Sequence, residues 1–143
     1  MHLTMFTDFA LRALMRLAGE PARSFATAEI AAEFGISRNH LAKVVRDLAG
    51  SGFITTQRGV GGGFALARPA QSITLGEVVR ALENEPLVEC FRPGGGTCLL
   101  TANCRLKAKL ASAREAFLRE LDATTLAECA YPAPKRRLTP EPV

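Results

Sequence analysis

Three of the four cysteines in this 143-residue chain lie within one short segment, with the spacing C-x7-C-x5-C. The segment, residues 90–104, reads CFRPGGGTCLLTANC, so a Pro-Gly-Gly-Gly turn separates the first two cysteines and few apolar side chains are available for packing. Thiolates are soft ligands that bind iron, zinc and copper(I). The sequence therefore predicts a loop that wraps a metal centre through Cys90, Cys98 and Cys104.

The spacing favours an iron–sulfur cluster over other uses of clustered thiols. Structural zinc sites usually take their ligands from C-x2-4-C pairs, and no such pair occurs in the chain. A reactive thiol needs a base beside it, but His2 and His40 are the only histidines. Three cysteines on one loop suit a bulky 4Fe-4S cluster better than a 2Fe-2S cluster, although four irons take one ligand more. The sequence leaves three candidates for the fourth ligand: Cys129, an oxygen ligand or a small molecule.

The composition is that of a soluble protein, with 48% apolar and 22% charged residues. No apolar run approaches the ~18 residues of a membrane span, and the charged N-terminus lacks the cleavage site of a signal peptide. We expect a cytoplasmic protein without membrane association, where clustered cysteines more often bind metals than form disulfides. We do not expect an enzyme, because no Ser-His-Asp or paired-carboxylate arrangement stands out.

Positive charge is concentrated in one window, residues 36–68. The window holds five basic residues and one acid, an excess equal to the net charge of +4 of the whole chain. The basic residues are Arg38, Lys43, Arg46, Arg58 and Arg68. Such a concentration is typical of a nucleic-acid-binding surface, although solvated helix faces that happen to be basic are the alternative.

The first part of this window predicts a helix-turn-helix. Residues 27–34 have helical apolar spacing, Gly35 permits a tight turn, and Ser37 is the predicted N-cap of a recognition helix at residues 38–49. The first turns of such a helix enter the major groove, where arginine pairs with guanine and asparagine with adenine. The predicted DNA contacts of this helix are Ser37, Arg38, Asn39, His40, Lys43 and Arg46.

A glycine-rich hairpin, the predicted wing at residues 53–67, follows directly. Its tip reads RGVGGG, without the Lys-Ser/Thr or the strand-to-helix context of a phosphate-binding loop. A hairpin in this place is typical of a winged helix, whose wing approaches the minor groove. We expect Arg58, Gly59 and Gly61 to contact DNA there.

An amphipathic helix is predicted at residues 4–18, with Thr4 as its N-cap. Its polar face carries Asp8, Arg12 and Arg16 at intervals of four residues. The simplest role of Asp8 is an i,i+4 ion pair with Arg12.

Two helices are predicted in the second half of the chain. Thr74 and Glu77 have the spacing of a capping box at the start of the first. The second, residues 105–121, carries a narrow apolar stripe that suits either packing within the chain or dimerisation. The stripe consists of Leu106, Leu110, Ala113, Phe117 and Leu121.

The predicted fold is therefore mainly α with a small β-hairpin wing. Its parts are a winged helix-turn-helix DNA-binding domain (1–84), a cluster-binding loop (85–104), a long dimerisation helix with a short terminal helix (105–131) and a tail expected to be disordered (132–143).

Four segments of the chain together resemble the NsrR-type repressors, the nitric-oxide-sensing branch of a winged-helix superfamily that also includes IscR and RirA. The segments are LTMFTDFALRALMRLA, ISRNHLAKVVRDL, GFITTQRGVGGGFALARP and ECF…C…CRLK. The resemblance implies a homodimer with one iron–sulfur cluster per subunit, each held by three loop cysteines. In the family the fourth ligand is an aspartate from the first helix of the other subunit, and Asp8 occupies that position.

The resemblance also implies a mechanism. The intact cluster holds the dimer in an arrangement that fits a palindromic operator on double-stranded DNA. Nitrosylation of the cluster by nitric oxide releases the DNA and derepresses genes for nitric-oxide stress.

Several residues bear on which branch the chain is similar to. IscR-like proteins have a histidine where this chain has Lys107, and IscR-like and RirA-like first helices lack the aspartate. The seven-residue first interval is also close to RirA-like loops, so sensing of iron or cluster status is the alternative, and a zinc-stabilised constitutive DNA-binding protein is another. Val60 stands where many relatives have an arginine, and Cys129 has no counterpart among the family's ligands.

Overall fold

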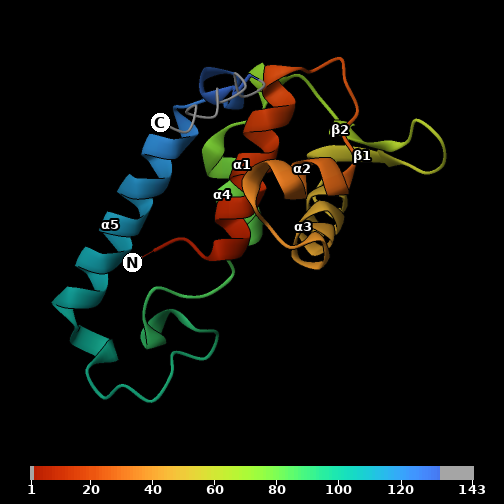
Figure 1. Ribbon diagram of the computed structural model, residues 1–143. Coiled ribbons are helices and arrows are strands. Elements are labelled where there is room, and N and C mark those ends of the chain that lie inside the picture. Colours follow the sequence, from red (N-terminus) through yellow and green to blue (C-terminus); the bar gives the residue numbers. More distant parts are fainter. Residues whose placement is uncertain (1, 133–143) are drawn as a thin grey trace, which may run out of the picture.

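The computed structural model describes residues 2–132, which form seven helices and strands joined by short 3-10 turns (Figure 1). The predicted tail lies outside the described residues, apart from Pro132. The elements are α1 (Met5–Gly19), α2 (Thr27–Phe34), α3 (Arg38–Gly50), β1 (Ile54–Gln57), β2 (Gly63–Leu66), α4 (Leu75–Leu82) and α5 (Arg105–Asp122), with 3-10 turns η1 (Ala70–Ser72), η2 (Glu89–Phe91), η3 (Thr101–Asn103) and η4 (Leu126–Cys129). The prediction of a mainly helical winged-helix fold is confirmed.

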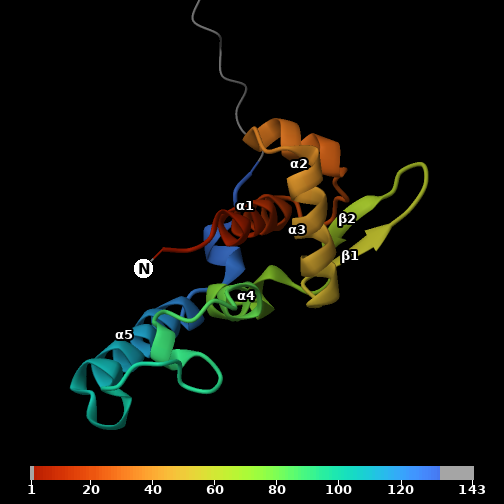
Figure 2. The ribbon, with the colours of Figure 1, turned by 90° about the horizontal axis from the view of Figure 1, so that it is seen from below.

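Helix α1 is the centre of the hydrophobic core. The side chain of Thr4 accepts a hydrogen bond from the amide of Thr7 and so begins the helix as predicted. Ala10, Ala13, Leu14 and Leu17 on its apolar face are buried, and the helix packs against α3, α4 and η4. Figures 1 and 2 show α3 and the hairpin on one side of α1, and α5 with the loop before it on the other.

Arg16, which the sequence places on the polar face of α1 with Asp8 and Arg12, is buried. The residue is 2% exposed, with its Nε atom 2.8 Å from Glu33 of α2 and its guanidinium 4.7 Å from the centre of the Phe25 ring. Burial lowers the pKa of Arg16, but Glu20 and Glu33 outweigh this and raise it overall, so the side chain stays charged. The buried cation therefore joins α1 to α2 and to the segment between them.

The helix-turn-helix forms from local signals. Gly35 ends α2 in the left-handed conformation, with φ of 65°, which glycine adopts without steric cost. Two residues later, the hydroxyl of Ser37 accepts a hydrogen bond from the backbone amide of His40, with an N–O distance of 3.1 Å. This bond begins α3. These two residues set the turn between the helices.

The hairpin of β1 and β2 is antiparallel, in the register that pairs Ile54 with Leu66 and Gln57 with Gly63. Ile54 and Phe64 are buried and anchor its base, and Phe64 also forms a bridge with Phe25. The tip, residues 58–62, extends beyond this base as the wing (Figure 1).

The predicted capping box of α4 is present. The hydroxyl of Thr74 accepts a hydrogen bond of 3.2 Å from the backbone amide of Glu77. In return, the Glu77 carboxylate accepts a hydrogen bond of 3.0 Å from the backbone amide of Thr74. Hydrogen bonds from Thr74 and then Arg68 hold the pKa of Glu77 below its usual value.

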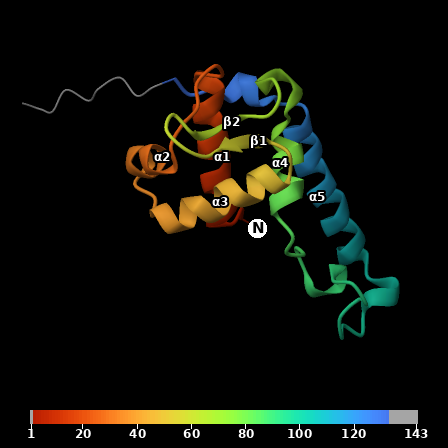
Figure 3. The ribbon, with the colours of Figure 1, turned by 90° about the vertical axis from the view of Figure 1, so that its right-hand side faces the viewer.

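Helix α5 packs along α4 through its C-terminal half, where Leu118 is buried (Figure 3). Its first half extends past the rest of the protein toward the cysteine loop. Among the described helices, none combines the length and the apolarity that crossing a membrane requires.

Candidate DNA-binding face and cysteine loop

The first turns of α3 present a set of exposed polar side chains to solvent. Ser37, Arg38, Asn39, Lys43 and Arg46 are exposed, while Leu41 and Val44 on the opposite side of the helix are buried. Within residues 2–132, no carboxylate lies in salt-bridge range of Arg38 or Lys43, whereas Arg46 lies 3.5 Å from Asp47. Unpaired cations beside an amide on one helix face can bind both phosphates and base edges.

His40 lies apart from this exposed set. Its ring packs edge-on against Phe9, with centroids 5.0 Å apart, and tilted against Phe6 at 6.2 Å. The residue is half-buried, so its ring joins the first turn of α3 to α1. The sequence did not signal this contact, because it depends on how the two helices cross.

The wing tip places Arg58, Gly59, Val60 and Gly61 in solvent. Gly59 and Gly61 have φ angles of 99° and 76°, a region that other residues rarely adopt. By contrast, Arg68, the last base of the positive window, is held by Glu77 at 2.9 Å and by the carbonyl of Ser72 at 2.7 Å. Arg58 is therefore the basic residue that the wing tip presents to solvent.

The cysteine loop connects α4 to α5 and holds its three thiols in different settings. Cys90 lies in η2 and is half-buried, and Cys98 is exposed. Cys104 is the N-cap of α5, where its sulfur accepts the amide of Lys107 at 3.4 Å. Cys90 and Cys104 thus lie in or at the start of a helical element, whereas Cys98 lies in solvent outside any helix or strand.

These thiols fit a metal cluster by their chemistry, but the described part of one chain does not complete a site. Thiolates are the usual ligands of iron–sulfur clusters, and three cysteines lie on this one loop. Nevertheless, no three His, Cys, Asp or Glu side chains among residues 2–132 come close enough together to hold a metal ion. A ligand set built from this chain therefore needs the loop to close further, a second chain, or both.

Asp8 lies on α1 in an ion pair with Arg12. Its two carboxylate oxygens lie 3.1 Å from Nε and 2.6 Å from Nη2 of Arg12, and both side chains are partly exposed. The predicted i,i+4 pair is present, and the structure does not bring Asp8 together with the loop cysteines of its own chain.

Two carboxylates make contacts that the sequence did not signal, one just before the cysteine loop and one within it. The carboxylate of Glu83, just before the loop, accepts hydrogen bonds from the backbone amide and the hydroxyl of Thr4, at 2.7 and 2.8 Å. Burial raises the pKa of Glu83, but hydrogen bonds from Thr7 and Thr4 outweigh it and hold the pKa below its usual value. Within the loop, hydrogen bonds from Thr97 hold the pKa of Glu89 low.

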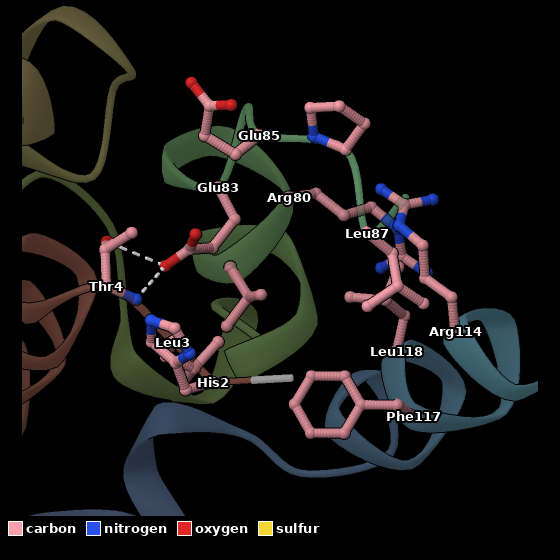
Figure 4. Close-up of a pocket in the computed structure, with 12 residues that line it drawn as sticks. His2, Leu3, Thr4, Arg80, Glu83, Glu85, Leu87, Arg114, Phe117 and Leu118 are labelled. Carbon is pink, nitrogen blue, oxygen red and sulfur yellow. Dashed lines mark hydrogen bonds between the residues drawn. The ribbon is translucent and has the colours of Figure 1, made fainter. Parts of the chain in front are cut away.

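A cleft of about 350 Å³ lies between the N-terminal segment, α4 and α5 (Figure 4). Phe117 and Leu118 of α5 form one side of it, and the Thr4–Glu83 contact borders the other. Cys129 lies away from this cleft in η4, which packs on α1, and is half-buried.

Comparison with known proteins agrees with this architecture. Residues 3–131 match the model of the Rrf2 family, described as iron-dependent transcriptional regulators. The chain is similar to CymR (YrzC), the global cysteine regulator of B. subtilis, with 25% identity and a TM-score of 0.73 over 91% of this chain and 96% of that one.

Two further solved structures are similar. The oxidized form of Staphylococcus aureus CymR has 27% identity and a TM-score of 0.70 over 91% of this chain and 96% of that one. T. potens IscR has 21% identity and a TM-score of 0.70 over 90% and 85% of the two chains, a likeness that shows the fold alone. The family match covers nearly the whole described chain, and the protein belongs to the Rrf2 family of DNA-binding transcriptional regulators, which are not enzymes.

Proposed function

We propose that this Rrf2 regulator is a cytoplasmic, homodimeric repressor whose cysteine loop holds one iron–sulfur cluster per subunit and senses nitric oxide. The observation that carries the proposal is the set of three thiols on the loop between α4 and α5, one of them capping α5. Cys90, Cys98 and Cys104 would be ligands, and Asp8 of the partner subunit would be the fourth. A cluster held there would supply irons that nitric oxide can attack.

The role of Asp8 requires it to exchange partners. In the single chain its carboxylate is bound by Arg12 on the same helix. Asp8 is partly exposed, so it can leave Arg12 and bind a cluster held by another subunit without disturbing the core. That exchange would join α1 of one subunit to the cysteine loop of the other.

Dimerisation would occur through α5. Leu106, at the start of its apolar stripe, is 64% exposed, and the first half of the helix extends past the body of its own chain (Figure 3). Exposed apolar helix surface of this kind is stable when a second copy covers it. A two-fold dimer would then place two recognition helices on the two halves of a palindromic operator.

A short series of contacts would link the cysteine loop to DNA. Glu83, at the start of the loop, holds Thr4 at the start of α1. In the first two turns of α1, Phe6 and Phe9 pack on His40, which lies in the first turn of α3. A change in the loop that moves α1 would therefore shift the residues nearest to the bases, which is the differential contact that a ligand-biased switch requires.

The DNA contacts can be tested by salt dependence. Lys43→Ala is expected to weaken binding to all sequences and to reduce the slope of log K against log salt by about 1, because one phosphate contact is lost. Arg38→Ala is expected to cost about 1–3 kcal/mol and to relax preference at one base pair. Fluorescence anisotropy with operator and random duplexes measures both effects.

The matched control for these variants is Arg119→Ala, which removes the same charge from the exposed surface of α5. Its affinity and salt slope should equal those of the parental protein. Equal losses in all three variants would contradict the assignment of α3 as the recognition helix, since only the net charge would then matter.

Sensing of iron or cluster status is the second candidate. The observation that favours it is the seven-residue interval between Cys90 and Cys98, which is also close to RirA-like loops. In that case removal of iron, and not nitric oxide, would release the DNA.

A further inference from the structure

The first two cysteines of the loop are joined through their neighbours in the sequence. Glu89 directly precedes Cys90, and Thr97 directly precedes Cys98. The amide and the hydroxyl of Thr97 both donate to the same oxygen, Oε1 of Glu89, at 2.8 and 2.9 Å. This Glu89–Thr97 clamp closes the Pro-Gly-Gly-Gly segment into a ring.

The backbone between the two ends is shaped to allow the clamp. The amide of Gly95 donates to the carbonyl of Arg92 at 2.8 Å and forms a tight turn. Gly94, Gly95 and Gly96 all have positive φ angles, of 89°, 79° and 63°. At Gly96 an added Cβ would lie 2.6 Å from Cγ of Glu89, whereas at Gly94 it would meet nothing within 4 Å. Gly96 therefore makes the room that the Glu89 side chain occupies.

We infer that Glu89 is a positioning residue that holds the Cys90 and Cys98 segments together before any metal binds. The inference rests on the proposed function in one respect, that these cysteines are ligands. Hardly any side chain of this loop is buried in the core, so packing alone does not hold its two arms. Bringing two ligands together in advance removes part of the ordering cost of metal binding.

The clamp leaves the third ligand independent. Cys104 is placed by its own hydrogen bond at the start of α5, and within residues 2–132 no hydrogen bond ties it to Glu89. Two ligands would thus be preset as a pair, and the third would join when the metal binds.

The test measures how close the two thiols lie in the metal-free, full-length chain. Cys104→Ser and Cys129→Ser leave only Cys90 and Cys98, whose effective concentration is measured by disulfide formation in a glutathione redox buffer. Glu89→Ala is expected to lower it about five- to tenfold, the low end of the effect of two hydrogen bonds. Gly96→Ala should do the same by displacing Glu89.

Each variant has a matched control. Gly94→Ala imposes the same kind of backbone strain without meeting Glu89, and Glu85→Ala removes an exposed carboxylate from the same loop. Both should retain the parental effective concentration. As a second readout, the four-cysteine protein reconstituted with iron and sulfide should lose iron to a chelator five- to tenfold faster in the Glu89→Ala and Gly96→Ala variants.

The possible results separate the clamp from the function. If Glu89→Ala and Gly96→Ala match their controls in the thiol measurement, the clamp is wrong, whatever the protein binds. If they differ as expected but the parental protein forms no iron–sulfur cluster, the clamp stands and the proposed function fails.

Discussion

Replacing Arg16 by alanine is expected to lower the free energy of unfolding by about 3–5 kcal/mol, the usual cost of removing one partner from a buried ion pair. Arg16 is 2% exposed, and its partner Glu33 is 15% exposed at the side chain. The substitution would strand the Glu33 carboxylate and remove one of the two guanidinium groups that lie over the Phe25 ring, the other being that of Arg23. Urea unfolding of the metal-free protein, followed by circular dichroism, measures the change.

Arg12→Ala is the control for this prediction, because Arg12 lies one turn earlier on the same helix and also pairs with a carboxylate. Its side chain is 45% exposed, so we expect a change within about 0.5 kcal/mol. A loss below about 1 kcal/mol for Arg16→Ala would show that the buried pair does not join α1 to α2 as described.

Introducing a charge at Leu106 is expected to have the largest effect on DNA binding. Leu106→Glu places a carboxylate in the exposed stripe that would meet a second copy, so the protein should become monomeric. A monomer contacts one half-site only, and the loss of avidity should weaken operator binding about 10²–10⁴-fold. Sedimentation velocity and fluorescence anisotropy measure the two effects separately.

Ala108→Glu provides the matched control, since this exposed residue lies on a different side of α5. It should leave both the dimer and the DNA affinity unchanged. A Leu106→Glu protein that remains dimeric with parental affinity would contradict dimerisation through this stripe.

Local signals account for the parts of the fold that the sequence predicted. Ser37 begins α3, and Thr74 with Glu77 begins α4, through hydrogen bonds between residues three apart. The tertiary contacts of Arg16 and His40 escaped prediction. Helical spacing puts Arg16 in line with Asp8 and Arg12, and only the approach of α2 shows that its guanidinium is covered.

The cysteine loop also has features that the sequence predicted and features that it did not. Residue type and spacing are enough to single out the three thiols as candidate metal ligands, because both are read directly from the sequence of the loop. The Glu89–Thr97 contact was not predicted, since it depends on the conformation of three successive glycines. A fourth ligand from a second subunit lies beyond what the pattern of one chain can place, and Asp8 entered through the resemblance alone.

Asp8→Ala isolates the contribution of the proposed fourth ligand. We expect it to weaken operator binding by the cluster-loaded protein while the metal-free protein keeps its fold, because Asp8 is partly exposed. A variant with parental cluster content and an unchanged response to nitric oxide would remove the Asp8 assignment and leave the three cysteines in place.

The most direct test of the central claim is operator binding by the anaerobically purified, full-length protein, measured together with its visible absorbance and its iron, sulfide and zinc contents. We expect a coloured protein that contains iron and sulfide, binds the operator, and loses both colour and DNA on addition of nitric oxide. Release of DNA on iron removal but not with nitric oxide would support the iron-sensing alternative. A colourless zinc protein that binds the operator regardless of nitric oxide would contradict the claim.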